Sequence, residues 1–298
     1  MPAPTDDSAI FDRDLLLSFR RRAFARAEPG ADFLLQRIAD DLADRLDAVE
    51  RRFPPVAVDL AGHTGAAAAA IARSGKADLI VRIERDRDFL QGPFPAIVGD
   101  EEILPLKPAS ADLVVSLMAL HATNDTPGAM VQVARALKPD GLFLAALSGS
   151  GTLGELRESL LQAEIELTGG ASPRIFPFPD VRDVGGLLQR AGFALPVTDV
   201  DNITVRYDSL FNLMADLRAM GMQNILRDRS RKPVSKRLFL RAAEIYAERF
   251  SDPDGRIRAT FSIIWLSGWA PHESQQKPLK PGSAKASLAE ALKKAEEN

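Results

Sequence analysis

The stretch Val56-Ala57-Val58-Asp59-Leu60-Ala61-Gly62-His63-Thr64-Gly65 is an apolar run that ends in an acid and a glycine-containing turn, and an alanine-rich segment follows it. This order is typical of a buried parallel strand that leads through a tight turn into a helix. Helix N-terminal amides and a turn of small residues let a ligand approach the backbone closely. The stretch therefore predicts a nucleotide-type site, with Asp59 at the strand end and with Gly62 and Gly65 in the turn.

The composition of the 298-residue chain is that of an ordinary globular protein, with 46% hydrophobic and 27% charged residues. A formal net charge of -3 gives no electrostatic argument for a nucleic-acid partner. The absence of cysteine excludes disulfides, thiolate catalysis and sulfur-ligated metal sites. No apolar run approaches the roughly 20 residues of a membrane span. The acidic N-terminus does not resemble a secretory signal, so the sequence predicts a cytoplasmic protein.

Strands and helices alternate from residue 56 onward, which predicts an α/β fold with a mostly parallel sheet and helices on both faces. The last two strands are expected to be long, and the first of them is expected to break near Asn202. The expected strands are 56–60, 78–83, 95–99, 111–117, 141–147, 194–206 and 257–269, and the expected helices are 65–74, 86–91, 127–138, 180–191, 209–221 and 234–250.

Two terminal segments flank the α/β domain, which is expected to span residues 51–270. Residues 1–50 predict a helical segment, and residues 271–298 predict a proline- and lysine-rich basic tail with a short amphipathic helix at 283–297. A helical insertion at about 208–250 separates the last two strands. We expect this insertion to cover the binding crevice as a lid that selects substrate and excludes water.

Basic residues gather in two places. Arg20, Arg21, Arg22 and Arg26 are interleaved with apolar positions of the first expected helix, and we interpret them as a solvated helix face. Contact with a membrane surface or an acidic partner is the alternative. A second basic segment, residues 227–237, joins the two helices of the insertion, and either a solvated face or a docking surface for a partner explains it equally well.

The opening stretch resembles motif I of class I S-adenosyl-L-methionine-dependent methyltransferases, an acid followed by three alternating glycines. Asp59, Ala61, His63 and Gly65 stand at these positions, so two of the three glycines are replaced. Alanine at position 61 is a mild change if its φ is negative, whereas the imidazole of His63 lies where a ligand would pass. A second methyltransferase-like string, Ala-Leu-Lys-Pro-Asp-Gly-Leu-Phe-Leu, occupies residues 136–144.

Acidic residues at the ends of the next two strands complete the predicted cofactor site. Glu84 ends the second strand, where a carboxylate accepts hydrogen bonds from ribose hydroxyls, and Asp100 with Glu101 ends the third, at the adenine edge. An exposed acid among arginines and an acidic turn are the alternatives. The predicted cofactor-binding residues are Asp59, Ala61, Gly62, His63, Gly65, Glu84, Asp100, Glu101 and Ser116.

The candidate catalytic residues are His121, Asn124 and Asp125, which directly follow the fourth strand. His121 would orient or deprotonate a substrate, with a hydrogen-bonded packing histidine as the alternative. Asp125 precedes a helix that begins near Pro127, and we favour an N-cap over catalysis for this residue.

One glycine-rich motif matches a dinucleotide-binding pattern, but we do not interpret it as a binding site. Gly149-Ser150-Gly151-Thr152-Leu153-Gly154 fits a dinucleotide fingerprint, but no second strand with a ribose-binding acid follows it. We interpret this segment as a loop on the substrate side.

The motifs beyond residue 100 resemble one family, the methyltransferase-like arginine hydroxylases that assist assembly of respiratory complex I. The core more distantly resembles the malonyl-carrier-protein methyltransferases of biotin synthesis. The matching strings are Asp100-Glu101-Glu102-Ile103-Leu104-Pro105, Leu120-His121 with Asn124-Asp125, Lys138-Pro139-Asp140-Gly141, Thr152-Leu153 with Glu155-Leu156-Arg157, Gly169-Gly170 with Ser172-Pro173, Asp216-Leu217 with Met220-Gly221, and His272-Glu273-Ser274-Gln275 with Gly282-Ser283-Ala284.

This resemblance implies a seven-stranded class I methyltransferase fold and S-adenosyl-L-methionine as cofactor. It also implies a protein substrate, an arginine in a quinone-module subunit of complex I, and hydroxylation in the mitochondrial members. The family's aromatic residue after the strand-four histidine is Ala122 here, which loosens the pocket wall.

A hydroxylase requires an oxidant, and a metal held by two histidines and a carboxylate is one source. His63 and His121 follow neighbouring strands, and Asp59 or Asp125 would complete such a triad. Because the family carries glycine at the position of His63, we predict no metal site.

Two other functions stay open. Ala61 and His63 favour a non-catalytic assembly factor with a degenerate cofactor site. A closed aromatic pocket under the insertion would favour a small-molecule or carrier-protein O-methyltransferase. For a complex I substrate, we expect a bacterial cytoplasmic protein that works at the inner face of the membrane, with peripheral contact at most.

Overall fold

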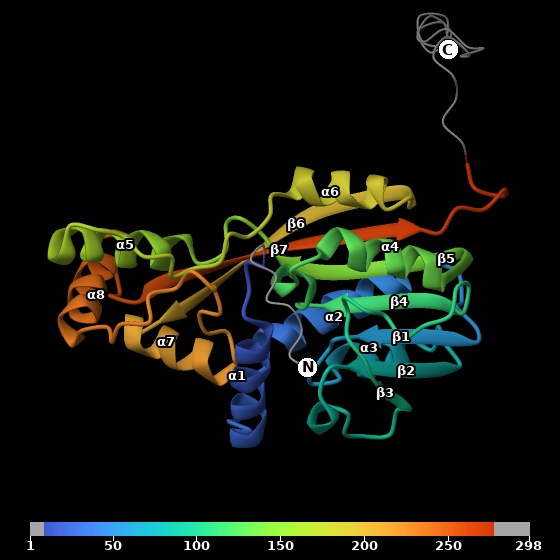
Figure 1. Cartoon of the computed structure of the whole chain (residues 1–298), viewed down its shortest axis with the longest axis horizontal. Helices are drawn as coiled ribbons and strands as arrows, with labels where there is room; N and C mark the ends of the chain where they lie inside the picture. The colour runs from blue at the N-terminus through green and yellow to red at the C-terminus, as the bar shows by residue number, and fades with distance from the viewer. Residues whose placement is uncertain (1–8, 277–298) are drawn as a thin grey trace, which may run out of the picture.

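The computed structural model describes residues 9–276, and Figure 1 shows its course. The helix predicted at 283–297 lies outside the described residues. Within residues 9–276, no helix is both long and apolar enough to cross a bilayer.

Seven strands form one sheet in the order β3-β2-β1-β4-β5-β7-β6. Neighbours from β3 to β5 are parallel, and β7 is antiparallel to both β5 and β6. This topology confirms the predicted fold class. The strands are β1 (Val56–Leu60), β2 (Leu79–Glu84), β3 (Ala96–Val98), β4 (Ala111–Leu117), β5 (Leu137–Ser148), β6 (Ala194–Tyr207) and β7 (Ile257–Trp269).

Two sequence-based expectations about local structure are wrong. The segment 86–91 forms only a single 3-10 turn, and β6 runs through Asn202 without a break, its register shifting instead between Ala194 and Val197. The helices are α1 (Arg13–Arg26), α2 (Phe33–Asp47), α3 (Ala66–Ser74), α4 (Thr126–Ala136), α5 (Gly154–Thr168), α6 (Val181–Arg190), α7 (Leu210–Ala219) and α8 (Lys236–Phe250), with 3-10 turns η1 (Arg87–Phe89) and η2 (Leu120–Ala122).

Helices cover both faces of the sheet, which explains why the central strands are apolar throughout. On one face, Leu42 of α2 and Ile71 of α3 pack against Val115 of β4. On the other, Met130 of α4 and Leu188 of α6 share a cluster with β1, β4 and β5. Every residue of β4 is buried, as a parallel strand covered on both sides requires.

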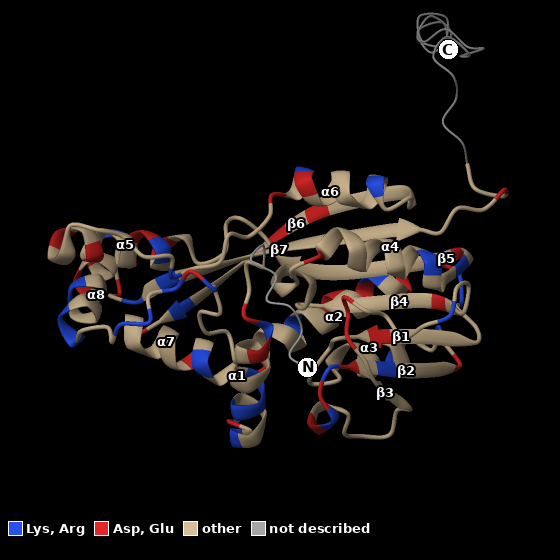
Figure 2. Cartoon of the chain, in the orientation of Figure 1, with Lys and Arg blue, Asp and Glu red and all other residues tan. Residues whose placement is uncertain are grey.

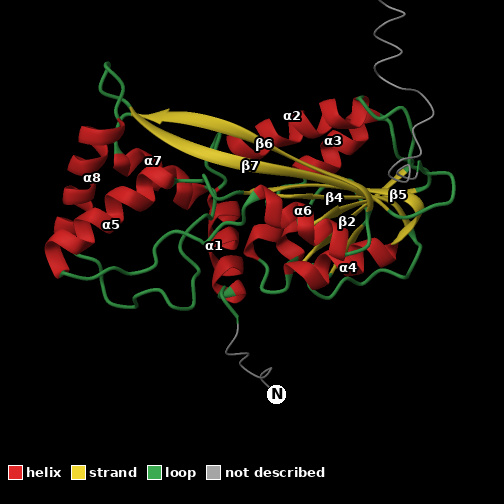
Figure 3. Ribbon diagram, turned by 90° about the horizontal axis from the view of Figure 1, so that it is seen from above, coloured by secondary structure: helices red, strands yellow, loops and turns green. Residues whose placement is uncertain are grey.

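Strands β6 and β7 extend well beyond the parallel part of the sheet, and α5, α7 and α8 pack on one side of this extension (Figure 3). Helix α1 lies between the extension and the carboxyl ends of β1, β2 and β4 (Figure 1). The carboxyl ends of parallel strands are where α/β proteins bind ligands. Helix α1 is therefore placed directly over the expected binding crevice.

Candidate active site

Asp59 lies near the carboxyl end of β1 with 1% of its surface exposed. Its Oδ2 accepts hydrogen bonds from the Ala68 amide at 3.3 Å and from Arg82 Nε at 3.4 Å. Its Oδ1 has no partner among the described residues. Burial raises the pKa of Asp59 to about 6, and the Arg82 guanidinium opposes that rise. Asp59 thus anchors the first turn of α3 and keeps one acceptor unused.

Ala61 adopts a φ of +59°, in the left-handed region that favours glycine. The premise of a negative φ at this position is therefore wrong. An alanine held in this region costs about 1 kcal/mol. Position 61 thus adopts a backbone conformation typical of glycine although alanine replaces the first glycine of motif I.

The two glycines that remain in the turn are those that the packing requires. A Cβ on Gly62 would lie 2.2 Å from Asp59 Oδ1. Gly65 has a φ of +79°, and a Cβ on it would lie 3.1 Å from the guanidinium carbon of Arg82. The buried Asp59–Arg82 pair therefore explains why neither position carries a side chain.

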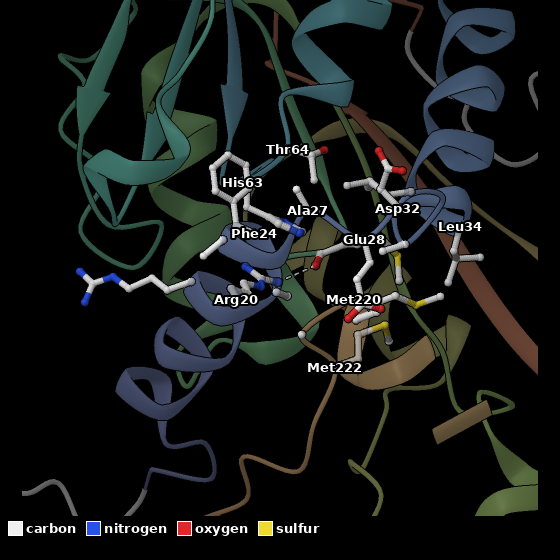
Figure 4. Close-up of a pocket in the computed structure, with 18 of the residues that line it drawn as sticks. Arg20, Phe24, Ala27, Glu28, Asp32, Leu34, His63, Thr64, Met220 and Met222 are labelled. Carbon is white, nitrogen blue, oxygen red and sulfur yellow. Dashed lines mark hydrogen bonds between the residues drawn. The ribbon is translucent and has the colours of Figure 1, made fainter. Parts of the chain in front are cut away.

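His63 projects from this turn toward a large cavity (Figure 4). Its ring contacts Phe89 edge-on, with centroids 6.1 Å apart, and its Nδ1 is buried without a partner in the part of the chain that the structure describes. Burial and the nearby Arg20 and Arg82 hold its pKa well below the usual range, so the imidazole is neutral. His63 thus forms part of the cavity wall as an uncharged group.

Glu84, the last residue of β2, is 4% exposed, so the alternative of a solvated acid is wrong. Burial raises its pKa to about 8, the charge of Asp59 adds to the rise, and Arg20 and Arg82 oppose it. Its Oε1 has no partner within residues 9–276. A buried acceptor of this kind at a strand end suits a pair of ribose hydroxyls.

Asp100 and Glu101 follow β3 and are occupied by Arg13 of α1. Arg13 Nη2 lies 2.8 Å from Asp100 Oδ1, and the same guanidinium pairs with Glu101 and Glu102. Arg85 Nε adds a contact to Asp100 at 3.1 Å. Arg13 and Arg85 lower the pKa of Asp100 against the effect of burial. The predicted adenine-binding acids therefore already carry partners.

Of the four arginines interpreted as a solvated face of α1, Arg21, Arg22 and Arg26 are exposed as predicted, and Arg20 is the exception. Arg20 is not on a solvated face; it enters the crevice, where its Nη2 donates to the Met118 carbonyl at 3.2 Å (Figure 4). Arg21 pairs with Asp86, whereas Arg22 stays at the surface over the ring of Phe19. Figure 2 shows these basic residues along the helix.

A helical stripe in the sequence could have revealed this face of α1. Arg13, Leu16, Arg20 and Phe24 recur at steps of three and four residues, so they share one side of the helix. That side of α1 faces the acids that follow β3, and the folded structure is needed to know where those acids lie.

Ser116 lies in β4, fully buried, and pairs with Ala145 of β5 on the α4 side of the sheet, whereas Asp59 faces α3 on the other side. The Oγ of Ser116 makes no hydrogen bond to any described residue. The side chain adds a third unused polar atom to those of Asp59 and Glu84, in the middle strands of the sheet.

Of the three candidate catalytic residues, His121 lines the large cavity. Its Nδ1 lies 3.4 Å from the Ser148 amide, its ring meets Phe178 edge-on, and burial lowers its pKa to about 3. Asn124 clamps the backbone of Phe11, accepting from its amide at 2.8 Å and donating to its carbonyl at 3.1 Å. Asp125 caps α4 through the Gly128 amide at 2.8 Å, as the alternative interpretation expects.

The large cavity has a volume of about 820 Å³ and lies between α1, α2, the β1–α3 turn and the end of α7 (Figure 4). Its wall is mostly apolar, with Phe24, Met220 and Met222 prominent, and Glu28 and Asp32 add carboxylates. From the helical insertion, residues 219–222 reach this wall. Helix α8 packs instead against α5 and β7, on the extension.

The considered metal triad does not form in the described chain. Within residues 9–276, no group of three histidine, aspartate or glutamate side chains is arranged to hold a metal ion. Asp59 is bound to Arg82, and Asp125 is bound to the start of α4.

Two of the three glycines of the false dinucleotide motif, Gly149 and Gly151, serve packing. A Cβ on Gly149 would lie 2.7 Å from Ile264 of β7, and the Leu153 amide donates to Thr260 of β7 at 2.7 Å. Close approach to β7 therefore explains Gly149 and Gly151, whereas a Cβ on Gly154 would meet no atom within 4 Å.

Comparison with known proteins places this geometry in a family. A family model described as a methyltransferase domain matches residues 58–145. The chain is 40% identical over 287 residues to "Arginine-hydroxylase NDUFAF5, mitochondrial" of Homo sapiens, an alignment that covers 94% of this chain and 83% of that protein. It is 32% identical over 263 residues to a malonyl-[acyl-carrier protein] O-methyltransferase of Xylella fastidiosa, covering 84% and 87% of the two chains.

Solved structures support the fold. The protein BH2331 from Bacillus halodurans superposes with a TM-score of 0.54 at 16% identity, over 78% of this chain and 98% of that one. These matches confirm the family resemblance that the sequence motifs predict. The chain is a methyltransferase-family enzyme and belongs to the arginine-hydroxylase NDUFAF5 family.

Proposed function

We propose that the chain binds S-adenosyl-L-methionine at the carboxyl ends of β1, β2 and β4. The observation that carries this proposal is a pair of buried carboxylate oxygens that have no partner among the described residues, Asp59 Oδ1 and Glu84 Oε1. Orphaned buried acceptors are rare in folded proteins and often mark a missing ligand. Asp59 and Glu84 stand on neighbouring strands beside the turn from Ala61 to Gly65, and their unused oxygens can accept hydrogen bonds from ribose hydroxyls and an ammonium group, so the residues present fit this cofactor.

Each residue has a distinct part in this proposal. Glu84 would accept hydrogen bonds from the ribose hydroxyls, and Asp100 or Glu101 would accept one from the adenine amine. The turn from Ala61 to Gly65 would lie against the amino-acid part, with the neutral ring of His63 as a wall. The cofactor supplies an electrophilic methyl group on a sulfonium.

We further propose a protein arginine as substrate, and hydroxylation as its modification. The names of the NDUFAF5 relatives support this, and the family resemblance points to a quinone-module subunit of complex I. The large cavity, lined by methionine side chains and three carboxylates, suits the long apolar stem and the cationic head of an arginine. His121 in the cavity wall stays neutral and is placed to orient the guanidinium.

The two candidate reactions differ in what they consume. Hydroxylation inserts one oxygen atom and requires an oxidant such as dioxygen with two electrons from a reductant. Methyl transfer requires only the sulfonium donor and the loss of a proton from the acceptor. The two products therefore differ in mass and in their need for dioxygen.

The experiment combines binding with mass spectrometry. S-adenosylhomocysteine is titrated calorimetrically, and the chain is then incubated with the quinone-module subunit and S-adenosylmethionine, in air with a reductant and without oxygen. We expect micromolar binding and an arginine that gains the mass of one oxygen atom only in air. A gain of one methyl group would replace hydroxylation by methyl transfer, and an unmodified subunit would contradict the substrate proposal.

A non-catalytic assembly factor is the second candidate. The observation that favours it is the closed state of the crevice at Glu84, where the cavity measures about 20 Å³. Absence of binding even at millimolar S-adenosylhomocysteine would favour this candidate.

A further inference from the structure

Helix α1 holds the acids at the end of β3 with its first arginine. The Arg13 guanidinium contacts Asp100, Glu101 and Glu102 together, and its side chain is 9% exposed. Arg85 strengthens the attachment of α1 to these acids, because its Nη1 donates a hydrogen bond to the Arg13 carbonyl at 3.1 Å. Charge-assisted contacts that are partly buried are among the stronger polar interactions in proteins. Three carboxylates suited to a ligand are thus bound to one residue of the same chain.

One turn further along, α1 fills the space beside Glu84. Leu16, Leu17 and Arg20 close on Glu84 and leave a cavity of about 20 Å³. This volume is enough for about one water molecule and too small for a nucleoside. Arg20 also lines the 820 Å³ cavity, so it separates the closed part of the crevice from the open part.

The start of α1 is anchored away from the acids. Asp12, the N-cap residue, receives a contact from Arg229 at 3.2 Å, and the Phe11 backbone pairs with Leu226. Both partners belong to the connection between α7 and α8. The insertion therefore helps to hold α1 in place without touching Glu84 or Asp100.

We infer that docked α1 and the nucleoside half of the cofactor exclude each other, so that α1 is an autoinhibitory strap which withdraws when cofactor binds. The inference rests on the proposed cofactor site and adds its regulation. Two observations carry it: the ion pairs of Arg13 with the adenine-side acids, and the filling of the space at Glu84. Contacts of the insertion with Asp12 and Phe11 set how firmly the strap is held.

The expected change in apparent affinity follows from the fraction of molecules in which α1 is withdrawn. Apparent affinity falls in proportion to this competent fraction. A variant that raises the fraction about tenfold, from 1% to 10%, tightens apparent binding about tenfold. Loss of a buried charged contact is large enough for a shift of this order.

The experiment titrates S-adenosylhomocysteine calorimetrically into the full-length chain and three variants. Arg13→Ala removes the ion pairs between α1 and the acids that follow β3. Arg229→Ala removes the ion pair with Asp12 without changing any group at the crevice. Arg37→Ala is the matched control because Arg37 pairs with Asp41 on the surface of α2 at 3.0 Å. We expect about tenfold tighter binding by the first two variants and unchanged binding by the control.

Hydrogen exchange of the α1 amides, residues 13–26, gives an independent readout. With saturating S-adenosylhomocysteine, we expect these amides to exchange at least about tenfold faster than in the free protein. Slower exchange would mean that α1 closes over the cofactor, and this result overturns the inference. Equal affinities in all four proteins would overturn it while leaving the cofactor proposal intact. Binding by none of them would overturn both.

Discussion

The two halves of the crevice differ in charge, filling and origin. The nucleoside half, at the ends of β2 and β3, is acidic and is occupied by arginines of α1. The cavity that remains there has a volume of about 20 Å³. The substrate half, toward α2 and the end of α7, is mostly apolar and holds about 820 Å³. In the first half, the acids that follow β3 have partners in α1, whereas Glu84 Oε1 has none among the described residues. The second half has a preformed cavity of about 820 Å³, so under the proposed assignment α1 would limit access of the cofactor and leave access of the substrate open.

Replacing Glu84 in the nucleoside half should have the largest effect on cofactor binding. Glu84→Ala deletes the acceptor of two ribose hydrogen bonds and should weaken binding of S-adenosylhomocysteine about 100-fold or more. Glu84→Gln, which keeps one acceptor oxygen and the volume, should lose less. Calorimetry of the three proteins measures this order. Equal affinities would place the nucleoside elsewhere and break the comparison.

The buried acids should also make stability depend on pH. The pKa of Glu84 is raised from 4.5 to about 8 and that of Asp59 from 3.8 to about 6, so folding favours their protonated forms. This stabilisation is complete below the usual values and is lost as the pH rises through the raised ones. Between pH 6.5 and 8.5 the free energy of unfolding should therefore fall by about 2 kcal/mol, mainly through Glu84.

Urea denaturation at several pH values in this range measures how the free energy of unfolding changes with pH. Glu84→Gln should flatten this dependence, since the amide does not titrate. A slope that survives in this variant would show that another group titrates here.

The substrate half should affect rate rather than cofactor affinity. His121→Ala removes the neutral imidazole in the cavity wall and should slow arginine modification about tenfold or more, with binding of S-adenosylhomocysteine unchanged. His121→Asn, which keeps a polar side chain, should recover part of the rate if the ring orients the substrate. Parallel loss of affinity and rate would instead assign His121 to packing against Phe178.

The smallest predicted effect lies in the turn between the halves. Ala61→Gly relieves the left-handed φ of +59° and should raise the free energy of unfolding by about 1 kcal/mol. Ala109, with a φ of +51°, offers a matched control, because Ala109→Gly should give a similar gain away from the crevice. Tighter cofactor binding by Ala61→Gly alone would show that strain in the turn also limits the site. A loss of stability in both variants would mean that the entropy of glycine outweighs the strain.

The same two regions show how far the sequence alone can lead. The central strands β1 and β4 were predictable because a continuous apolar run has few ways to be buried, and Asp59 and Glu84 followed from their places at strand ends. The role of Arg13 and Arg20 was not predictable from composition, since an arginine-rich helix is usually solvated. Their partners are distant in sequence, and only the sheet order brings β2 and β3 beside α1.

Asn124 and Asp125 illustrate a second limit. Both follow β4, where active-site residues gather, yet their side chains bind the Phe11 backbone and the first turn of α4. A polar residue at a strand end predicts proximity to a site, and its hydrogen bonds decide whether it faces that site.

The most direct test of the account is a crystal structure of the wild-type chain grown with S-adenosylhomocysteine. We expect the ribose at Glu84 and the adenine beside Asp100, with Arg13 and Arg20 of α1 moved out of the crevice. A ligand confined to the 820 Å³ cavity, with the Arg13 ion pairs intact, would contradict the assignment of the acidic half as the cofactor site.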